Sequence, residues 1–111
     1  MSQNLNPRPI SNPNRFKVRN LDTDYTPTAD DASPWLLRFT AAATFTVPSD
    51  ADVPFPLGSV INVAQDGSGT VTVAAGAGAT VVNAGDLKGG GAVAFVVKVA
   101  PNRWYLSGAL A

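Results

Sequence analysis

The sequence contains no cysteine and no histidine, and all eight of its acidic residues are aspartate. Without cysteine the chain can form neither a disulfide framework nor a thiolate metal site. Without histidine it lacks the usual base for a nucleophilic serine. No apolar run approaches the roughly 20 residues of a membrane-spanning helix, and the polar start of the chain is unlike a signal peptide. We therefore expect no cofactor, no bound metal and no membrane partner.

Length and composition favour one globular domain behind a basic arm. A chain of 111 residues suits a single hydrophobic core, and its hydrophobic fraction of 45% is too high for a disordered protein. Residues 1–14 combine three prolines with four asparagines and show no periodicity, which is typical of an extended segment. We assign residues 1–20 to an extended basic N-terminal arm and residues 21–111 to a β-sandwich domain.

The net charge is zero, but the charges are unevenly distributed along the chain. Residues 1–20 carry a net charge of +4 with no acid, residues 21–66 carry −6, and the remainder carries +2. A basic arm followed by an acidic body favours docking onto another copy or onto an acidic surface. Four cations with one aromatic residue make a weak nucleic-acid pattern, so we expect no nucleic-acid partner. The candidate docking cations are Arg8, Arg15, Lys17 and Arg19.

Alternation of apolar and polar residues predicts an all-β fold. No segment shows helical spacing over ten residues, whereas β-branched and aromatic residues recur with period two between turn signals. The expected fold is a small antiparallel β-sandwich or flattened barrel of seven to nine short strands. The predicted strands cover residues 16–21, 35–39, 44–48, 59–65, 70–75, 80–83, 92–100 and 103–108.

Two hairpins are predicted from turn chemistry. Pro101 and Asn102 suit the central positions of a tight turn between residues 92–100 and 103–108. The glycine-rich residues 66–69 suit a second hairpin. A phosphate-binding loop would need glycines leading into a helix, and here they lead into strands, so we interpret them as turn and bulge residues. The predicted centre of the core contains Val93, Phe95, Val97, Val99, Trp104 and Leu106.

Few residues suggest chemistry. The paired carboxylates Asp30–Asp31, Asp22 and Asp24, and Asp50 and Asp52 lie in connections, where aspartate is a common turn former. We favour this interpretation over an acid–base pair or a calcium site, which would need six or more oxygen ligands. Trp35 and Trp104 could form a sugar-stacking platform, but core or interface positions are more common for such aromatics. We expect that the chain is not an enzyme.

One connection between strands is unusually apolar. Residues 53–58, "VPFPLG", place Phe55 between two prolines. Edge strands of a small sheet are prone to pair with other chains, and this sequence has few charges to prevent it. We therefore expect neighbouring copies to cover the edges, and we include Phe55 among the candidate docking residues.

Three segments resemble a β-module that recurs in tailed-bacteriophage virion proteins such as tail fibres, minor tail proteins and other appendages. These segments are residues 24–32, 37–81 and 87–110. The most specific motifs are "FTVP" followed by "PFPLGSVI", then "QDGSGTVTVAAGAG", and the closing "WYLSG". The resemblance implies a structural protein of the virion, assembled in the host cytoplasm.

A small stand-alone β-domain with an extended arm also resembles capsid decoration (cement) proteins, which sit on the outside of a capsid and commonly form trimers. This resemblance implies a protein that binds the major capsid protein, stabilises the shell and associates with itself as a homotrimer. The alternative is a tail appendage or receptor-binding module that contacts tail proteins. A carbohydrate-binding domain is a third, less favoured interpretation.

Overall fold

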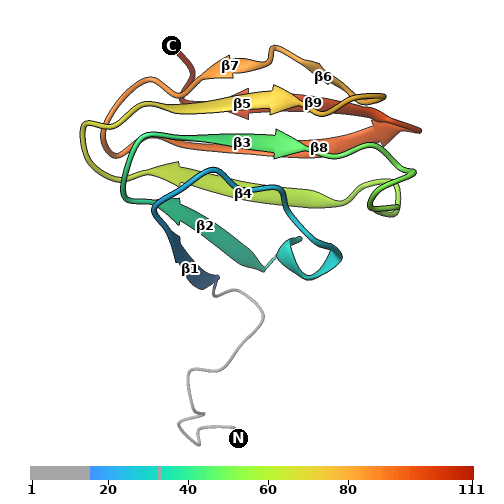
Figure 1. Cartoon of the computed structure of the whole chain (residues 1–111), viewed down its shortest axis with the longest axis horizontal. Helices are drawn as coiled ribbons and strands as arrows, with labels where there is room; N and C mark the ends of the chain where they lie inside the picture. Colours follow the sequence, from blue (N-terminus) through green and yellow to red (C-terminus); the bar gives the residue numbers. More distant parts are fainter. Residues whose placement is uncertain (1–15, 33) are drawn as a thin grey trace, which may run out of the picture.

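The computed structural model describes residues 16–32 and 34–111, which form nine β-strands and one short 3₁₀ turn (Figure 1). Strand residues alternate between buried and exposed positions, as period-two patterning requires. The element bounds are β1 Lys17–Leu21, η1 Ala29–Asp31, β2 Trp35–Phe39, β3 Ala43–Val47, β4 Val60–Gln65, β5 Val71–Ala75, β6 Thr80–Val82, β7 Gly85–Asp86, β8 Val93–Ala100 and β9 Arg103–Gly108.

The strands form two sheets that pack face to face, with β3 and β5 lying in front of β8 and β9 in Figure 1. The large sheet has six strands in the order β1-β2-β4-β8-β9-β6, and the small sheet has three in the order β3-β5-β7. The core lies between them, and Trp104, Phe39 and Phe45 are its largest fully buried side chains. The prediction of a small all-β sandwich with seven to nine short strands is confirmed.

From β2 to β8, consecutive strands alternate between the two sheets, and this makes the strand pairing mixed. β2 pairs with β4 in parallel, and β3 pairs with β5 in parallel, because a strand of the opposite sheet separates each pair along the chain. β1 with β2, and β6 with β9, are also parallel, whereas β4–β8, β8–β9 and β5–β7 are antiparallel. The structure thus corrects the expected antiparallel pairing to a mixed one.

Residues 66–69 carry the chain from one sheet to the other. The sequence predicted a hairpin here, but β4 and β5 lie in different sheets, so that prediction was wrong. The buried Gln65 amide holds the crossing, since its Oε1 accepts from the Val71 amide at 3.1 Å. Gly69 is required because a Cβ there would lie 2.3 Å from the backbone nitrogen of Ala42. These glycines therefore serve turns and close packing, as the sequence indicated.

The hairpin predicted at Pro101 and Asn102 is confirmed, and it joins β8 to β9. Asn102 has a φ of 56°, a left-handed conformation that asparagine tolerates better than most residues. A register shift between Lys98 and Ala100 marks an irregularity just before the turn.

The core uses the face of β8 opposite to the one predicted. Trp104 and Leu106 are buried as expected, but Val93 and Phe95 are 52% and 37% exposed. In the β8–β9 register Val96 lies opposite Leu106, so Val96 and its alternate neighbours face the core. Apart from Lys98, both faces of this strand are apolar, so alternation located the strand without deciding which face is buried.

β1 extends the folded domain into the segment assigned to the arm. Residues 17–21 pair in parallel with β2, so the large sheet begins before the predicted boundary at residue 20. The alternation that starts at Phe16 is the signal for this correction, since it continues without a break into the strand. Residues 1–15 of the predicted arm, including Arg8 and Arg15, lie outside the described residues.

Candidate functional site

The outward side of the large sheet carries many apolar side chains, interrupted by the uncharged polar residues Asn62 and Ser107 on either side of Phe95. Strand register and alternation place them together: Val60 lies opposite Val97, and Val97 lies opposite Tyr105 on the next strand. We call this surface the outer face. Its members are Val18 on β1, Leu36 on β2, Val60 on β4, Val93, Phe95, Val97 and Val99 on β8, Tyr105 on β9 and Val82 on β6.

Exposure of large apolar side chains is concentrated on the outer face. Seven such residues are exposed among the described residues, and five of them belong to this face: Val18, Val93, Phe95, Val99 and Tyr105. Of the other two, Phe16 directly precedes β1 and Leu57 lies in the connection before β4. Scattered exposed apolar residues are ordinary on proteins, whereas a contiguous group marks a surface that binds something.

The outward side of the small sheet has a different character. The register places Thr44 opposite Thr72, Thr46 opposite Ala74, and Thr72 opposite Asp86. The Thr72 hydroxyl donates to Asp86 Oδ1 at 2.6 Å. These polar and small side chains suit contact with water, as is common for the outer side of a sheet in a sandwich. The apolar outer face is therefore a property of one sheet and not of the whole surface.

The outer face was not expected from the sequence, because its residues on β8 were assigned to the core. No signal in the sequence reveals the outer face, and Lys98 favoured the wrong assignment. It alternates with Val97 and Val99, so a lysine falls on one face of β8 while the other face is wholly apolar. Placing the lysine outward is the ordinary choice, and only the partners of its amine explain why it lies inward.

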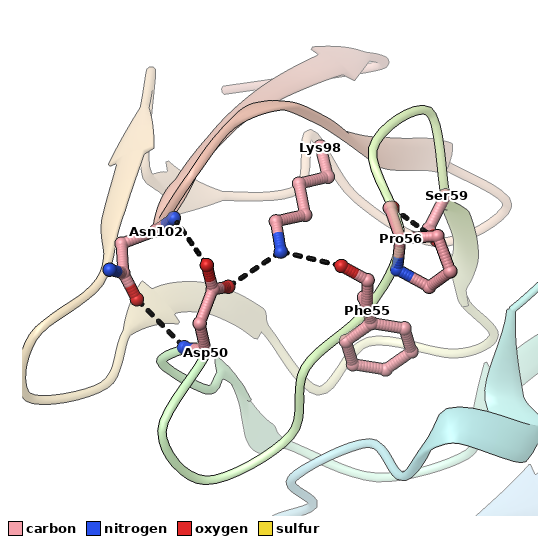
Figure 2. A network of polar contacts seen from close by, with 6 residues as sticks. All are labelled: Asp50, Phe55, Pro56, Ser59, Lys98 and Asn102. Carbon is pink, nitrogen blue, oxygen red and sulfur yellow. Dashed lines mark hydrogen bonds and ion pairs between the residues drawn. The ribbon is translucent and has the colours of Figure 1, made fainter.

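Lys98 is 5% exposed, and its amine is satisfied by two oxygens from the 48–59 connection (Figure 2). Its Nζ lies 2.6 Å from Asp50 Oδ1 and donates to the Phe55 carbonyl at 2.5 Å. The Asp50 backbone nitrogen donates to Asn102 Oδ1 at 2.7 Å, and the Asn102 backbone nitrogen donates to Asp50 Oδ2 at 3.1 Å. The network therefore binds this connection to β8 and to the turn of the β8–β9 hairpin.

Phe55, a predicted docking residue, lies in the core. It is 3% exposed, and its ring packs edge-on against Trp104 with ring centres 5.4 Å apart and an interplanar angle of 86°. The structure corrects the expected exposure of this side chain. The exposed large apolar residue of this connection is Leu57, at 65%.

Two of the predicted docking cations are described, and both lie beside Trp35. The Lys17 Nζ is 5.6 Å from the centre of the indole ring, and the Arg19 guanidinium carbon is 4.6 Å from it. Such cation–π contacts contribute about 0.5–1 kcal/mol at exposed sites. Lys17 is exposed at the start of β1, so it is the more accessible of the two cations.

Arg19 also pairs with a buried carboxylate. Its Nε lies 3.1 Å from Asp31 Oδ1, and the Asp31 side chain is fully buried. The opposite oxygen, Oδ2, accepts from the Tyr25 hydroxyl at 2.6 Å and from the Thr28 amide at 2.9 Å. Burial, together with the hydrogen bond to Asp31 and its negative charge, raises the pKa of Tyr25 to about 12. Arg19 therefore stabilises its own chain in addition to any contact with a partner.

The paired carboxylates are separated by their structural contacts. Asp24 accepts from the Thr44 amide at 2.8 Å, Asp31 pairs with Arg19, and Asp50 pairs with Lys98. Among residues 16–32 and 34–111, no three potential metal-ligating side chains of the His, Cys, Asp and Glu types lie together. The same residues include no helix with the length and apolar character needed to cross a membrane.

Comparison with known proteins gave no match to a protein-family model, a curated protein or a solved structure.

Proposed function

We propose that the chain is a structural protein of a tailed-bacteriophage virion, acting as a decoration protein on the outer capsid surface. The outer face is the observation that carries the proposal, because five large apolar side chains are exposed on one side of a sheet. Contiguous apolar surface of this kind is typical of sites that bind other proteins. The resemblance of residues 37–81 and 87–110 to the phage virion β-module favours a virion as the assembly to which this surface binds.

A capsid lattice would strengthen each such contact through repetition. A shell offers many equivalent sites, so a weak single contact becomes stable attachment when several linked copies bind together. A protein that binds the assembled shell and not its separated subunits also stabilises the shell by mass action. The exposed Lys17 at the edge of the large sheet favours an acidic region of the major capsid protein.

A tail appendage or receptor-binding module is the second candidate function. The motifs of residues 37–81 and 87–110 favour it, since the module they resemble recurs in tail fibres and minor tail proteins. A two-tryptophan sugar platform is not supported, because Trp104 is fully buried while Trp35 lies beside two cations. Aromatic rings must be accessible on one side to stack on a sugar.

Electron microscopy of purified virions carrying a label fused after Ala111 would test the proposal. Label distributed over the head supports decoration, whereas label at the tail supports the appendage and overturns decoration. Absence of the chain from purified virions would overturn both roles. A label placed on an abundant non-virion protein of the same infected cells provides the control for contamination.

A further inference from the structure

The outer face has about the minimum size of a specific protein–protein interface. Six strands spaced about 4.8 Å apart span roughly 24 Å, and the eight residues of β8 extend about 26 Å. Because the edge strands are shorter, the footprint is on the order of 500 Å² per copy. Two such faces together would bury about 1,000 Å², which reaches the lower range of specific interfaces. This figure is a flat area, and the accessible surface of the side chains is larger.

The charges of the outer face allow it to contact a copy of itself. Its centre consists of β4, β8 and β9, where Val60, Val97 and Tyr105 are direct neighbours and carry no charge. Arg38 on β2 pairs with Asp66 of its own chain, and Arg103 lies at the start of β9. A two-fold contact places identical patches against each other, so a single-sign centre would repel itself. The neutral centre avoids that cost.

We propose that the outer face binds the same face of a second copy, so that two large sheets pack face to face. Phe95 and Tyr105 act as the central anchors, since aromatic side chains dominate the binding energy of many interfaces. Face-packed sheets lie about 10 Å apart, a spacing that side chains of this size fill. The contact differs from the edge-to-edge association expected from the sequence, and it does not depend on a role in the virion. A face that is paired with a second copy is not free to bind a capsid, so the two contacts compete for the same surface.

Sedimentation velocity of the full 111-residue chain, with substitutions on the two outward sheet surfaces, tests this proposal. We expect the wild-type chain to sediment as a dimer, at twice its 11.4 kDa mass, at micromolar concentration. Phe95→Lys and Val93→Lys each place a charge in the contact, and each should weaken association by at least about tenfold. Thr44→Lys adds the same charge to the small sheet and should leave association unchanged.

The variants should fold, because each substitution alters an outward-facing residue. Far-ultraviolet circular dichroism and thermal melting check that each variant keeps its sheets. If Phe95→Lys unfolds, Val93→Lys alone is sufficient for the test, because Val93 is 52% exposed. A wild-type monomer up to about 100 μM overturns the proposal, since a specific contact of this size should be populated there. Association that persists in a folded Val93→Lys variant, or that Thr44→Lys abolishes equally, also overturns it.

Discussion

Replacing Asp50 with asparagine should reveal how far the buried Lys98 depends on its counter-charge. Lys98 is 5% exposed, and its Nζ lies 2.6 Å from Asp50 Oδ1. Asparagine preserves the size of the side chain and one acceptor oxygen but removes the negative charge. The ammonium then stays buried with only neutral acceptors, one of which is the Phe55 carbonyl. Burying a charge without its partner is costly, so the folded state should lose stability.

The size of this loss follows from the burial of the two partners. Removing one partner of a fully buried pair costs about 3–5 kcal/mol, and the 29% exposure of Asp50 lets solvent screen part of it. We therefore expect Asp50→Asn to lower the free energy of unfolding by about 2 kcal/mol. The exposed pair of Arg38 and Asp66 provides the matched control, where Asp66→Asn should cost less than about 1 kcal/mol.

Urea unfolding followed by tryptophan fluorescence measures both variants, because Trp104 is fully buried in the fold. All proteins are compared at one concentration, since self-association adds to the apparent stability. Adding Lys98→Met to Asp50→Asn removes the buried, unpaired positive charge and should recover part of the lost free energy of unfolding. The reasoning is refuted if Asp50→Asn costs no more than Asp66→Asn, or if about 0.5 M salt abolishes the difference between them.

Three further predictions concern local features of the chain. Tyr25→Phe should lower the free energy of unfolding by a constant amount below pH 10, because the raised pKa of Tyr25 means that the folded state favours the neutral phenol. In urea unfolding, the difference in free energy from wild type should narrow as the pH rises from 10 to 12, and a difference independent of pH would contradict this. Gly69→Ala should lower the thermal unfolding temperature markedly, since its Cβ would meet backbone at 2.3 Å, whereas Gly89→Ala has open space and should change it little; equal effects in calorimetry would count against the crossing geometry. Deleting residues 1–14 should leave the circular-dichroism spectrum of the β-domain unchanged but weaken attachment to capsids in co-sedimentation, and raised salt should weaken attachment further. Occupancy of the truncated chain equal to that of the full chain, at both low and high salt, would remove the docking role predicted for the basic arm.

Strand positions could be predicted because period-two alternation is a local property of the sequence. Residues 92–100 and 103–108 and the turn at Asn102 were located within a residue or two in this way. The partner of each strand could not be found by the same reasoning. The glycine-rich residues 66–69 suit a hairpin and a crossing between sheets equally well, and only the distant contact of Gly69 with the 40–43 segment distinguishes the two.

The candidate site was less predictable because its residues resemble core residues. Val93 and Phe95 have the composition of a buried face, while the opposite face of β8 carries Lys98. Lys98 is buried only because Asp50, far away in the sequence, supplies a counter-charge that no local pattern reveals. The same limit applies to Phe55, whose position against Trp104 depends on the path of a connection between sheets.

Thiol reactivity at single engineered cysteines would test the central claim, that the outer face is exposed in the single chain and covered by binding. The chain has no cysteine of its own, so Val93→Cys and Val96→Cys each introduce one unique thiol. In dilute solution Val93→Cys should react rapidly with a maleimide and Val96→Cys only on unfolding, since these positions are 52% and 0% exposed. At high protein concentration Val93→Cys should also become protected. Equal reactivity at the two positions, or rapid labelling of Val93→Cys at every concentration, would contradict the account.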